Sequence, residues 1–72
     1  MQRLHCYVLY HPFTGLIMQA GRGVAIVRDG LLAAEIVGVD HHTIDSHRQK
    51  VDLSRVLERG DETRIATLID IG

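Results

Sequence analysis

Three histidines and an aspartate stand close together in the stretch HHTIDSH, residues 41–47. Imidazole nitrogens and carboxylate oxygens are common ligands of zinc and related metals. A tight turn in this stretch would bring His42, Asp45 and His47 together as a metal site. Structural zinc sites usually have four ligands, so this set is incomplete. The remaining ligand would come from His5, Cys6, His11 or a second chain. The spacing matches no zinc signature, and a solvated polar loop is the alternative.

The same stretch contains residue types that serve in nucleophilic catalysis, namely His42, Asp45 and Ser46. A catalytic triad needs such groups arranged in space beside an oxyanion donor and a pocket. Three polar residues within five positions are more typical of a loop. The sequence therefore favours a non-catalytic protein with no cofactor, and a metal-binding protein or metal-assisted enzyme using residues 41–47 is kept as an alternative.

Cys6 is the only cysteine of the chain, so no intramolecular disulfide can form. It belongs to the apolar side of an alternating stretch, whereas a reactive thiol needs an exposed, electropositive setting. We expect Cys6 to be a small buried hydrophobe. A lone cysteine also suits a reducing compartment, which predicts a cytoplasmic protein.

A nucleic-acid-binding small barrel is another alternative function. Such barrels stack bases on exposed aromatic rings beside basic side chains. The candidates for this role are Arg3, Tyr7, Tyr10, Phe13 and Arg22. The net charge of −1 gives no strong positive field of the kind that attracts nucleic acid. The segment Gly21-Arg22-Gly23 is too short for a phosphate-binding loop. It indicates a break between two strands. Nucleic-acid binding is therefore not favoured.

The elements that would position these residues centre on residues 23–40, the most apolar part of the chain. Asp29-Gly30 between β-branched runs predicts a two-residue turn joining two strands of a hairpin. In the register set by that turn, both faces of the hairpin are apolar, although a sheet with one wet face alternates apolar and polar residues. One face is predicted to form an oligomer interface, made of Val24, Ile26, Leu31, Ala33, Val37 and Val39. A chain of 72 residues has little structure to spare for covering both faces, so we expect a homo-oligomer.

The flanking segments supply the other elements. Residues 3–10 alternate apolar and polar positions and predict a strand, as do residues 64–71. Asp52 is a good N-cap for a short helical turn over about 53–59, α or 3₁₀. The expected fold is mainly β, a small SH3-like or OB-like barrel of five or six short strands with that single helical turn. An open α+β sheet is the alternative.

The length predicts a single domain over residues 1–72, and no run of about 18 apolar residues predicts a membrane span. Hydrophobic residues form 46% of the chain, enough for both a core and an interface. The function we expect is that of a small non-catalytic binding module, a regulatory or adaptor protein that contacts another protein and acts as a homo-oligomer.

Overall fold

The computed structural model describes residues 3–60 and 63–71, without the side chain of Arg3. In chain order the elements are β1 (Arg3–Tyr10), β2 (Ile17–Val24), β3 (Leu32–Ile36), the 3₁₀ turn η1 (His41–Thr43), β4 (Gln49–Val51), the 3₁₀ turn η2 (Leu53–Arg55), β5 (Leu57–Glu58), β6 (Arg64–Ala66) and β7 (Leu68–Asp70). The chain is a small compact, mainly β domain, as predicted. Its described residues contain seven strands rather than five or six, and no α-helix that an α+β sheet would need.

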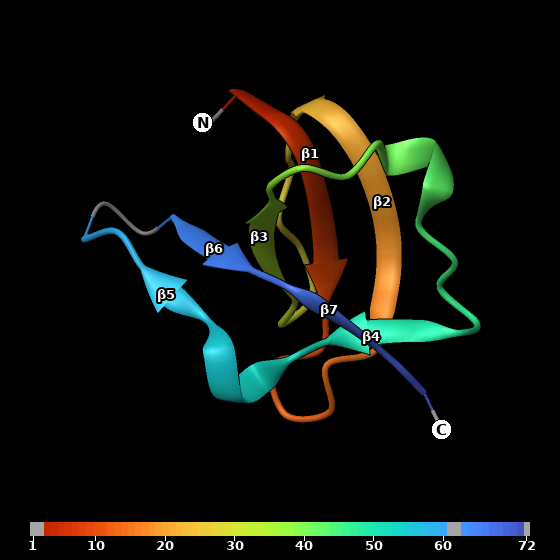
Figure 1. The fold of residues 1–72 in the computed structure, drawn as a ribbon. Helices are drawn as coiled ribbons and strands as arrows, with labels where there is room; N and C mark the ends of the chain where they lie inside the picture. The colour runs from red at the N-terminus through yellow and green to blue at the C-terminus, as the bar shows by residue number, and fades with distance from the viewer. Residues whose placement is uncertain (1–2, 61–62, 72) are drawn as a thin grey trace.

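Strand β1 is an inner strand of the larger sheet, whose order is β2-β1-β3-β6-β5 (Figure 1). Both neighbours of β1 run antiparallel to it, and β3 pairs with β6 in parallel. The strands β4 and β7 form a separate two-stranded sheet, and an isolated bridge between Leu16 and Lys50 connects β4 to the start of β2. Strands β3 and β6 also have a partner on each side, but β1 is the longest of these three inner strands, with eight residues.

Both faces of β1 are buried, and each face belongs to its own hydrophobic cluster. The main core consists of Cys6, Val8, Tyr10, Ile17, Ala34, Ile36, Val51 and Ala66. The second cluster consists of Leu4, Tyr7, Leu9 and Leu31. This division follows the alternation predicted for residues 3–10, except that Leu4 has changed sides.

A β-bulge explains the exception. Leu4 lies opposite Gly23 but Tyr7 lies opposite Gly21, so two residues of β1 face the single residue Arg22 of β2. An extra residue in one strand inverts the alternation beyond it. Leu4 therefore joins Tyr7 in the second cluster.

The turn at Asp29-Gly30 forms as predicted. Asp29 and Gly30 both have positive φ, 52° and 74°, and the Leu31 N–H donates to the Arg28 carbonyl at 3.0 Å. Positive φ at both central positions is the signature of a type I′ turn.

The hairpin pairing predicted around this turn is wrong. Strands β2 and β3 do not pair with each other, because β1 lies between them. Residues 25–31 instead cross one face of β1, where Ala25 and Leu31 pack onto Tyr7 and Leu9. This crossover covers the second apolar face of the sheet within one subunit, so the face lists derived from the hairpin register do not hold.

The predicted break at Gly21-Arg22-Gly23 is also wrong, because all three residues lie within β2. Gly21 is required there for packing and not for a turn. A Cβ at Gly21 would lie 2.8 Å from the hydroxyl oxygen of Tyr7, so any larger residue would displace this buried ring.

The helical turn expected over about 53–59 is shorter than predicted. Asp52 caps it as expected, its side chain accepting the Ser54 N–H. The turn ends at Arg55, because Leu57 and Glu58 pair with β6 as the strand β5. The strand predicted over 64–71 is likewise divided at Thr67, whose carbonyl accepts the Asp52 N–H at 2.9 Å.

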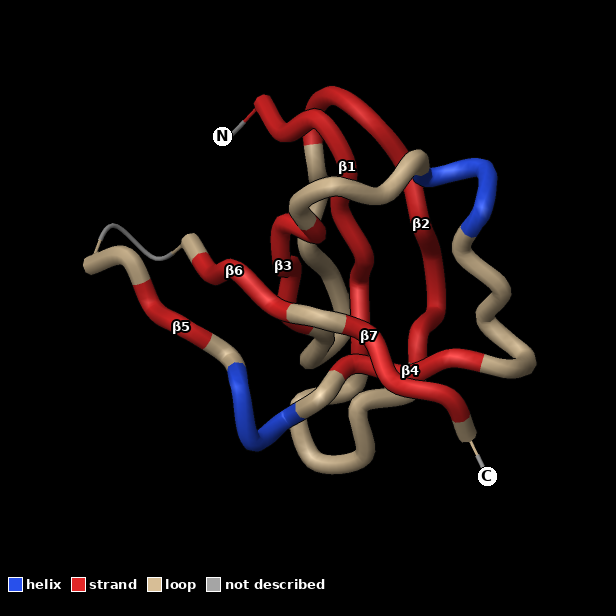
Figure 2. Tube along the Cα trace, in the orientation of Figure 1, coloured by secondary structure: helices blue, strands red, loops and turns tan. Residues whose placement is uncertain are grey.

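The two 3₁₀ turns lie on opposite sides of the molecule (Figure 2). No helix in the described part of the chain is long and apolar enough to cross a membrane. The strands β6 and β5 form one edge of the larger sheet, and an ion pair between Arg59 Nη2 and Glu35 Oε1, 2.7 Å apart, adds to the pairing of β6 with β3.

Candidate functional site

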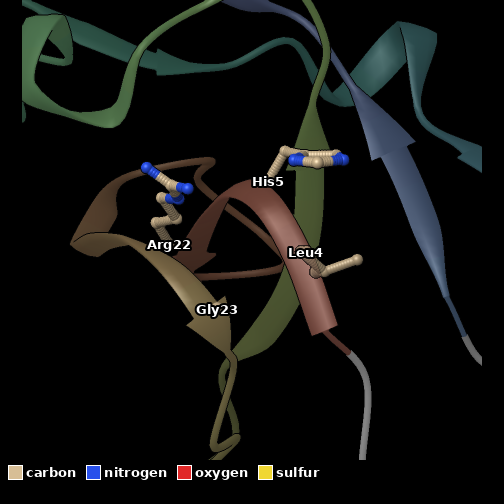
Figure 3. A pocket seen from close by; sticks show the side chains of 4 residues that line it. All are labelled: Leu4, His5, Arg22 and Gly23. Carbon is tan, nitrogen blue, oxygen red and sulfur yellow. The ribbon is translucent and has the colours of Figure 1, made fainter.

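Polar side chains gather at the end of the sheet where β1 begins. His5 from β1 and Arg22 from β2 line a cavity of about 210 Å³ with Asp40 and His41. The same His5 and Arg22, with Leu4 and Gly23, line an adjoining cavity of about 430 Å³ (Figure 3). The bulge in β1 lies at this position, and both side chains extend to the same side of the sheet.

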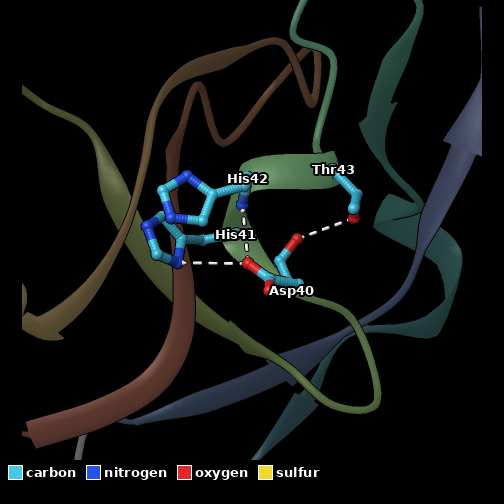
Figure 4. Close-up of polar contacts among 4 residues, drawn as sticks. All are labelled: Asp40, His41, His42 and Thr43. Atoms are coloured by element: carbon cyan, nitrogen blue, oxygen red, sulfur yellow. Dashed lines mark hydrogen bonds and ion pairs between the residues drawn. The ribbon is translucent and has the colours of Figure 1, made fainter.

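The turn η1 supplies the rest of the site and is held rigidly. Asp40 is its N-cap, and the Asp40 Oδ1 accepts the His42 N–H at 2.9 Å. The Asp40 carbonyl accepts both the backbone N–H of Thr43, at 2.9 Å, and its hydroxyl, at 2.7 Å (Figure 4). Ile44, directly after the turn, packs against the main core. The backbone that carries His41 and His42 is therefore fixed at both ends.

Asp40, His41 and His42 present their polar atoms to one another. His41 Nδ1 lies 3.6 Å from Asp40 Oδ1, and the two imidazole ring centroids are 3.9 Å apart with 38° between the ring planes. One potential ligand atom from each of the three residues lies within 4.8 Å of the others. In the part of the chain that the structure describes, this is the one group of three or more His, Cys, Asp or Glu side chains so placed.

The carboxylate of this group is kept in its charged form. The backbone N–H of His42 lowers the pKa of Asp40, and the nearby His42, His41 and Arg22 act in the same direction. An ionised carboxylate beside two imidazoles is a set of donors that suits a divalent cation of the zinc type.

The predicted metal ligands are not brought together as a set of three in the described residues. His42 belongs to the η1 group, but Asp45 and His47 lie further along the chain in a separate turn. The Asp45 Oδ1 accepts the backbone N–H of His47 at 2.9 Å, and its Oδ2 is 3.8 Å from Arg48 Nε. The Asp45 side chain therefore stabilises the turn at residues 45–48, which is an exposed polar loop.

The residue types considered for catalysis are not connected either. No hydrogen bond joins the side chains of His42, Asp45 and Ser46 among the residues described. Cys6 is buried in the main core, and burial raises the pKa of its thiol, which keeps it protonated and unreactive.

The aromatic residues considered for base stacking are mostly inside the protein. Tyr7 and Tyr10 are buried in the two clusters on either side of β1, whereas the Phe13 side chain is 93% exposed. Arg22 is exposed beside the cavities, and the Arg3 side chain lies outside the described part. A single exposed ring does not make a platform for successive bases.

The six residues predicted as an interface do not lie on one face. Leu31 is buried in the second cluster, and Ala33 is half-buried beside it. Val24, Ile26, Val37 and Val39 are exposed. Val24 is the last residue of β2, and Ile26 follows that strand. Val37 and Val39 follow the end of β3. The end of β2 pairs with the start of β1, and the end of β3 pairs with the middle of β1.

Sequence reasoning included His41 in the histidine-rich loop but missed Asp40 as a member of the site. The signal was present, because an aspartate before a short helical segment is a favoured N-cap, the rule that identified Asp52. Applied to Asp40, it would have placed the adjacent histidines on one fixed turn. No protein-family model matches the chain, and no curated protein or solved structure shows a significant match to it.

Proposed function

We propose that this protein is a small non-catalytic binding module that acts through protein–protein contacts as a homo-oligomer. The observation that carries the proposal is a group of exposed aliphatic side chains at the end of the sheet where β1 begins, here called the aliphatic end. Its members are Val24, Ile26, Val37 and Val39, whose side chains are 38–74% exposed. A second copy of the chain is the partner that fits exposed aliphatic side chains of this kind, whose neighbours at the same end of the sheet include the charged Arg22 and Asp40.

The exposed area of one subunit supports this. A monomeric protein of 8.0 kDa is expected to expose about 4,450 Å², from the scaling of surface with mass. This subunit exposes 5048 Å², an excess of about 600 Å² on that scaling. A standard interface buries about 800 Å² on each partner, so the excess is of the size that pairing two copies would remove.

The proposal includes a closed arrangement of strands within each subunit. The larger sheet connects β2 through β1 and β3 to β6, and β7 continues β6 along the chain. Strand β7 pairs with β4, and the bridge between Lys50 and Leu16 connects β4 back to the start of β2. We infer a small barrel of the SH3-like or OB-like kind closed by that one bridge. A barrel protects its strand edges, which leaves the aliphatic end as the surface for self-association.

The regulatory or adaptor role follows from the same surface. A homo-oligomer presents the polar turns of several subunits at once, which suits contact with another protein more than turnover of a substrate. The single buried Cys6 fits a reducing compartment, and we place the protein in the cytoplasm on that ground.

The test is sedimentation equilibrium of the wild-type protein with two matched variants. Val37 and Leu57 have side chains that are both 67% exposed, but Leu57 lies in β5, outside the aliphatic end. We expect an oligomer for wild type at micromolar concentration, a monomer for Val37→Lys, and an oligomer for Leu57→Lys, with unchanged circular dichroism in each case. A monomeric wild type, or equal disruption by both substitutions, would reject the proposal.

A further inference from the structure

The turn η1 joins two histidine rings and one carboxylate in a way that the sequence spacing did not indicate. Their ligand atoms lie within 4.8 Å of one another, and Asp40 Oδ1 is 3.6 Å from His41 Nδ1. Two ligands of a tetrahedral zinc ion, each about 2.0–2.2 Å from the metal, lie roughly 3.3–3.6 Å apart. The Asp40–His41 separation matches this spacing, and side-chain rotation would have to bring the ligand atom of His42 to the same ion.

From this arrangement we infer that Asp40, His41 and His42 form a binding site for one divalent transition-metal ion of the zinc type. The inference goes beyond the proposed self-association and does not depend on it. Two imidazoles and one carboxylate are a donor set found in zinc sites with three protein ligands, where water or another group completes the coordination. Nitrogen-rich sets of this kind favour zinc, copper and nickel over magnesium and calcium.

The surroundings of the turn favour binding without rearrangement of the backbone. Thr43 donates twice to the Asp40 carbonyl, and Ile44 anchors the end of the turn in the main core. A site whose backbone is already fixed loses little conformational freedom when it takes up a ligand. The Asp40 side chain is 63% exposed and His42 is exposed as well, so a hydrated ion reaches the site directly.

The neighbouring cavity contains the groups that lie nearest to the remaining coordination position. It is lined by His5 and Arg22 together with Asp40 and His41. Because Asp40 and His41 line this cavity, an ion held by η1 would lie at its edge, and His5 and the Arg22 guanidinium are the other groups that line it. Water, His5 or a small anion drawn by Arg22 would fill the remaining coordination position.

The test is a zinc titration of metal-stripped protein in competition with a chromophoric chelator. Asp40→Asn is the informative variant, because asparagine caps a helical turn as well as aspartate does but lacks the charged ligand. His42→Gln removes a second ligand. His47→Gln and Asp52→Asn are the matched controls, a histidine and a capping aspartate outside the group.

We expect one zinc ion per chain for wild type and for both controls. The two ligand variants should bind at least about tenfold more weakly, since even lost second-shell contacts cost about 10–100-fold at metal sites. Zinc should also shift the ring ¹⁵N resonances of His41 and His42 while leaving those of His11 and His47 in place.

Two results would overturn the inference. The first is the absence of stoichiometric zinc binding by the wild-type protein, with no ring shifts at His41 or His42. The second is a loss of affinity in His47→Gln as large as in His42→Gln, which would move the ligands to the turn at Asp45.

Discussion

The two 3₁₀ turns of this protein have the same backbone design, but their capping carboxylates differ in exposure. Each is three residues long and is preceded by an extended aspartate whose side chain accepts the N–H two residues on, at 2.9 Å in η1 and 3.2 Å in η2. In η2 the carboxylate of Asp52 also accepts the Ser54 hydroxyl at 2.7 Å and lies 3.5 Å from Arg55 Nε. The Asp52 side chain is 14% exposed and that of Asp40 is 63% exposed.

This difference shows how a capping aspartate becomes available for chemistry. In η2 the Ser54 hydroxyl donates a hydrogen bond to the Asp52 carboxylate, and Arg55 forms an ion pair with it. In η1 the corresponding positions carry His42 and Thr43, and the Thr43 hydroxyl turns to the Asp40 carbonyl instead. The carboxylate of Asp40 is then shared only with the backbone and the imidazoles, so its charge faces outward.

The largest expected difference between the turns concerns their anchors in the main core. Val51, just before the Asp52 cap, is buried, whereas Ile44, just after η1, is half-buried. We expect Val51→Ala to lower the free energy of unfolding by roughly 2–3 kcal/mol and Ile44→Ala by about 1 kcal/mol, since the cost follows burial and the remaining cavity. Urea denaturation followed by circular dichroism at one protein concentration measures both. Equal losses would show that the turns are equally embedded.

The next largest expected difference is the effect of zinc on stability, which should depend on the cap of η1 and not on the cap of η2. At a free zinc concentration roughly ten times the dissociation constant, binding should add about 1.4 kcal/mol to the stability of the native state. Asp52→Asn should keep this increment and Asp40→Asn should lose most of it, because only Asp40 lies beside the imidazoles. Thermal melts with and without a chelator provide the measurement. An increment retained in Asp40→Asn would contradict the difference drawn between the turns.

The caps themselves should behave alike in metal-free protein. Replacing either Asp40 or Asp52 by alanine removes one acceptor for an otherwise unpaired backbone N–H. We expect each change to lower the melting temperature by roughly 3–8 °C in a domain of this size, and the asparagine variants to melt close to wild type. Unchanged melting of Asp52→Ala would show that its cap contributes nothing.

The smallest effect concerns the acid limb of stability. The Ser54 hydroxyl lowers the pKa of Asp52, followed by the Ser54 N–H, so this contribution to stability is present above the ordinary carboxyl pKa of about 4. It is lost as the pH falls through the lowered pKa. Ser54→Ala should raise the pKa of Asp52 in an NMR titration. Thr43→Ala should leave that of Asp40 in place, because the Thr43 hydroxyl donates to a carbonyl.

Local chemistry in the sequence was sufficient to predict several of these features. The positive φ values at Asp29 and Gly30 and the cap at Asp52 depend on residues within a few positions of each other. The burial of Cys6 followed from the alternation of its own strand. Such features have their causes inside a short window, where side-chain type decides the conformation.

What could not be predicted depends on distant partners. A type I′ turn indicates that the chain reverses, but it does not show that β1 will enter between β2 and β3. The bulge opposite Arg22 and the fit of Gly21 beneath Tyr7 arise from that same pairing. For the site, closeness in sequence suggested His42, Asp45 and His47, whereas the capping geometry of Asp40 placed His41 and His42 together.

The position of β1 between β2 and β3 also has a consequence for the kinetics of folding. The β1–β2 hairpin closes a short loop and can nucleate early, while the parallel pairing of β3 with β6 joins residues about thirty positions apart, Glu35 with Ile65. Until β3 has docked, the other edge of β1 remains open. We therefore expect the transition state to contain the β1–β2 hairpin and to lack the β3–β6 contacts, with the C-terminal strands joining last.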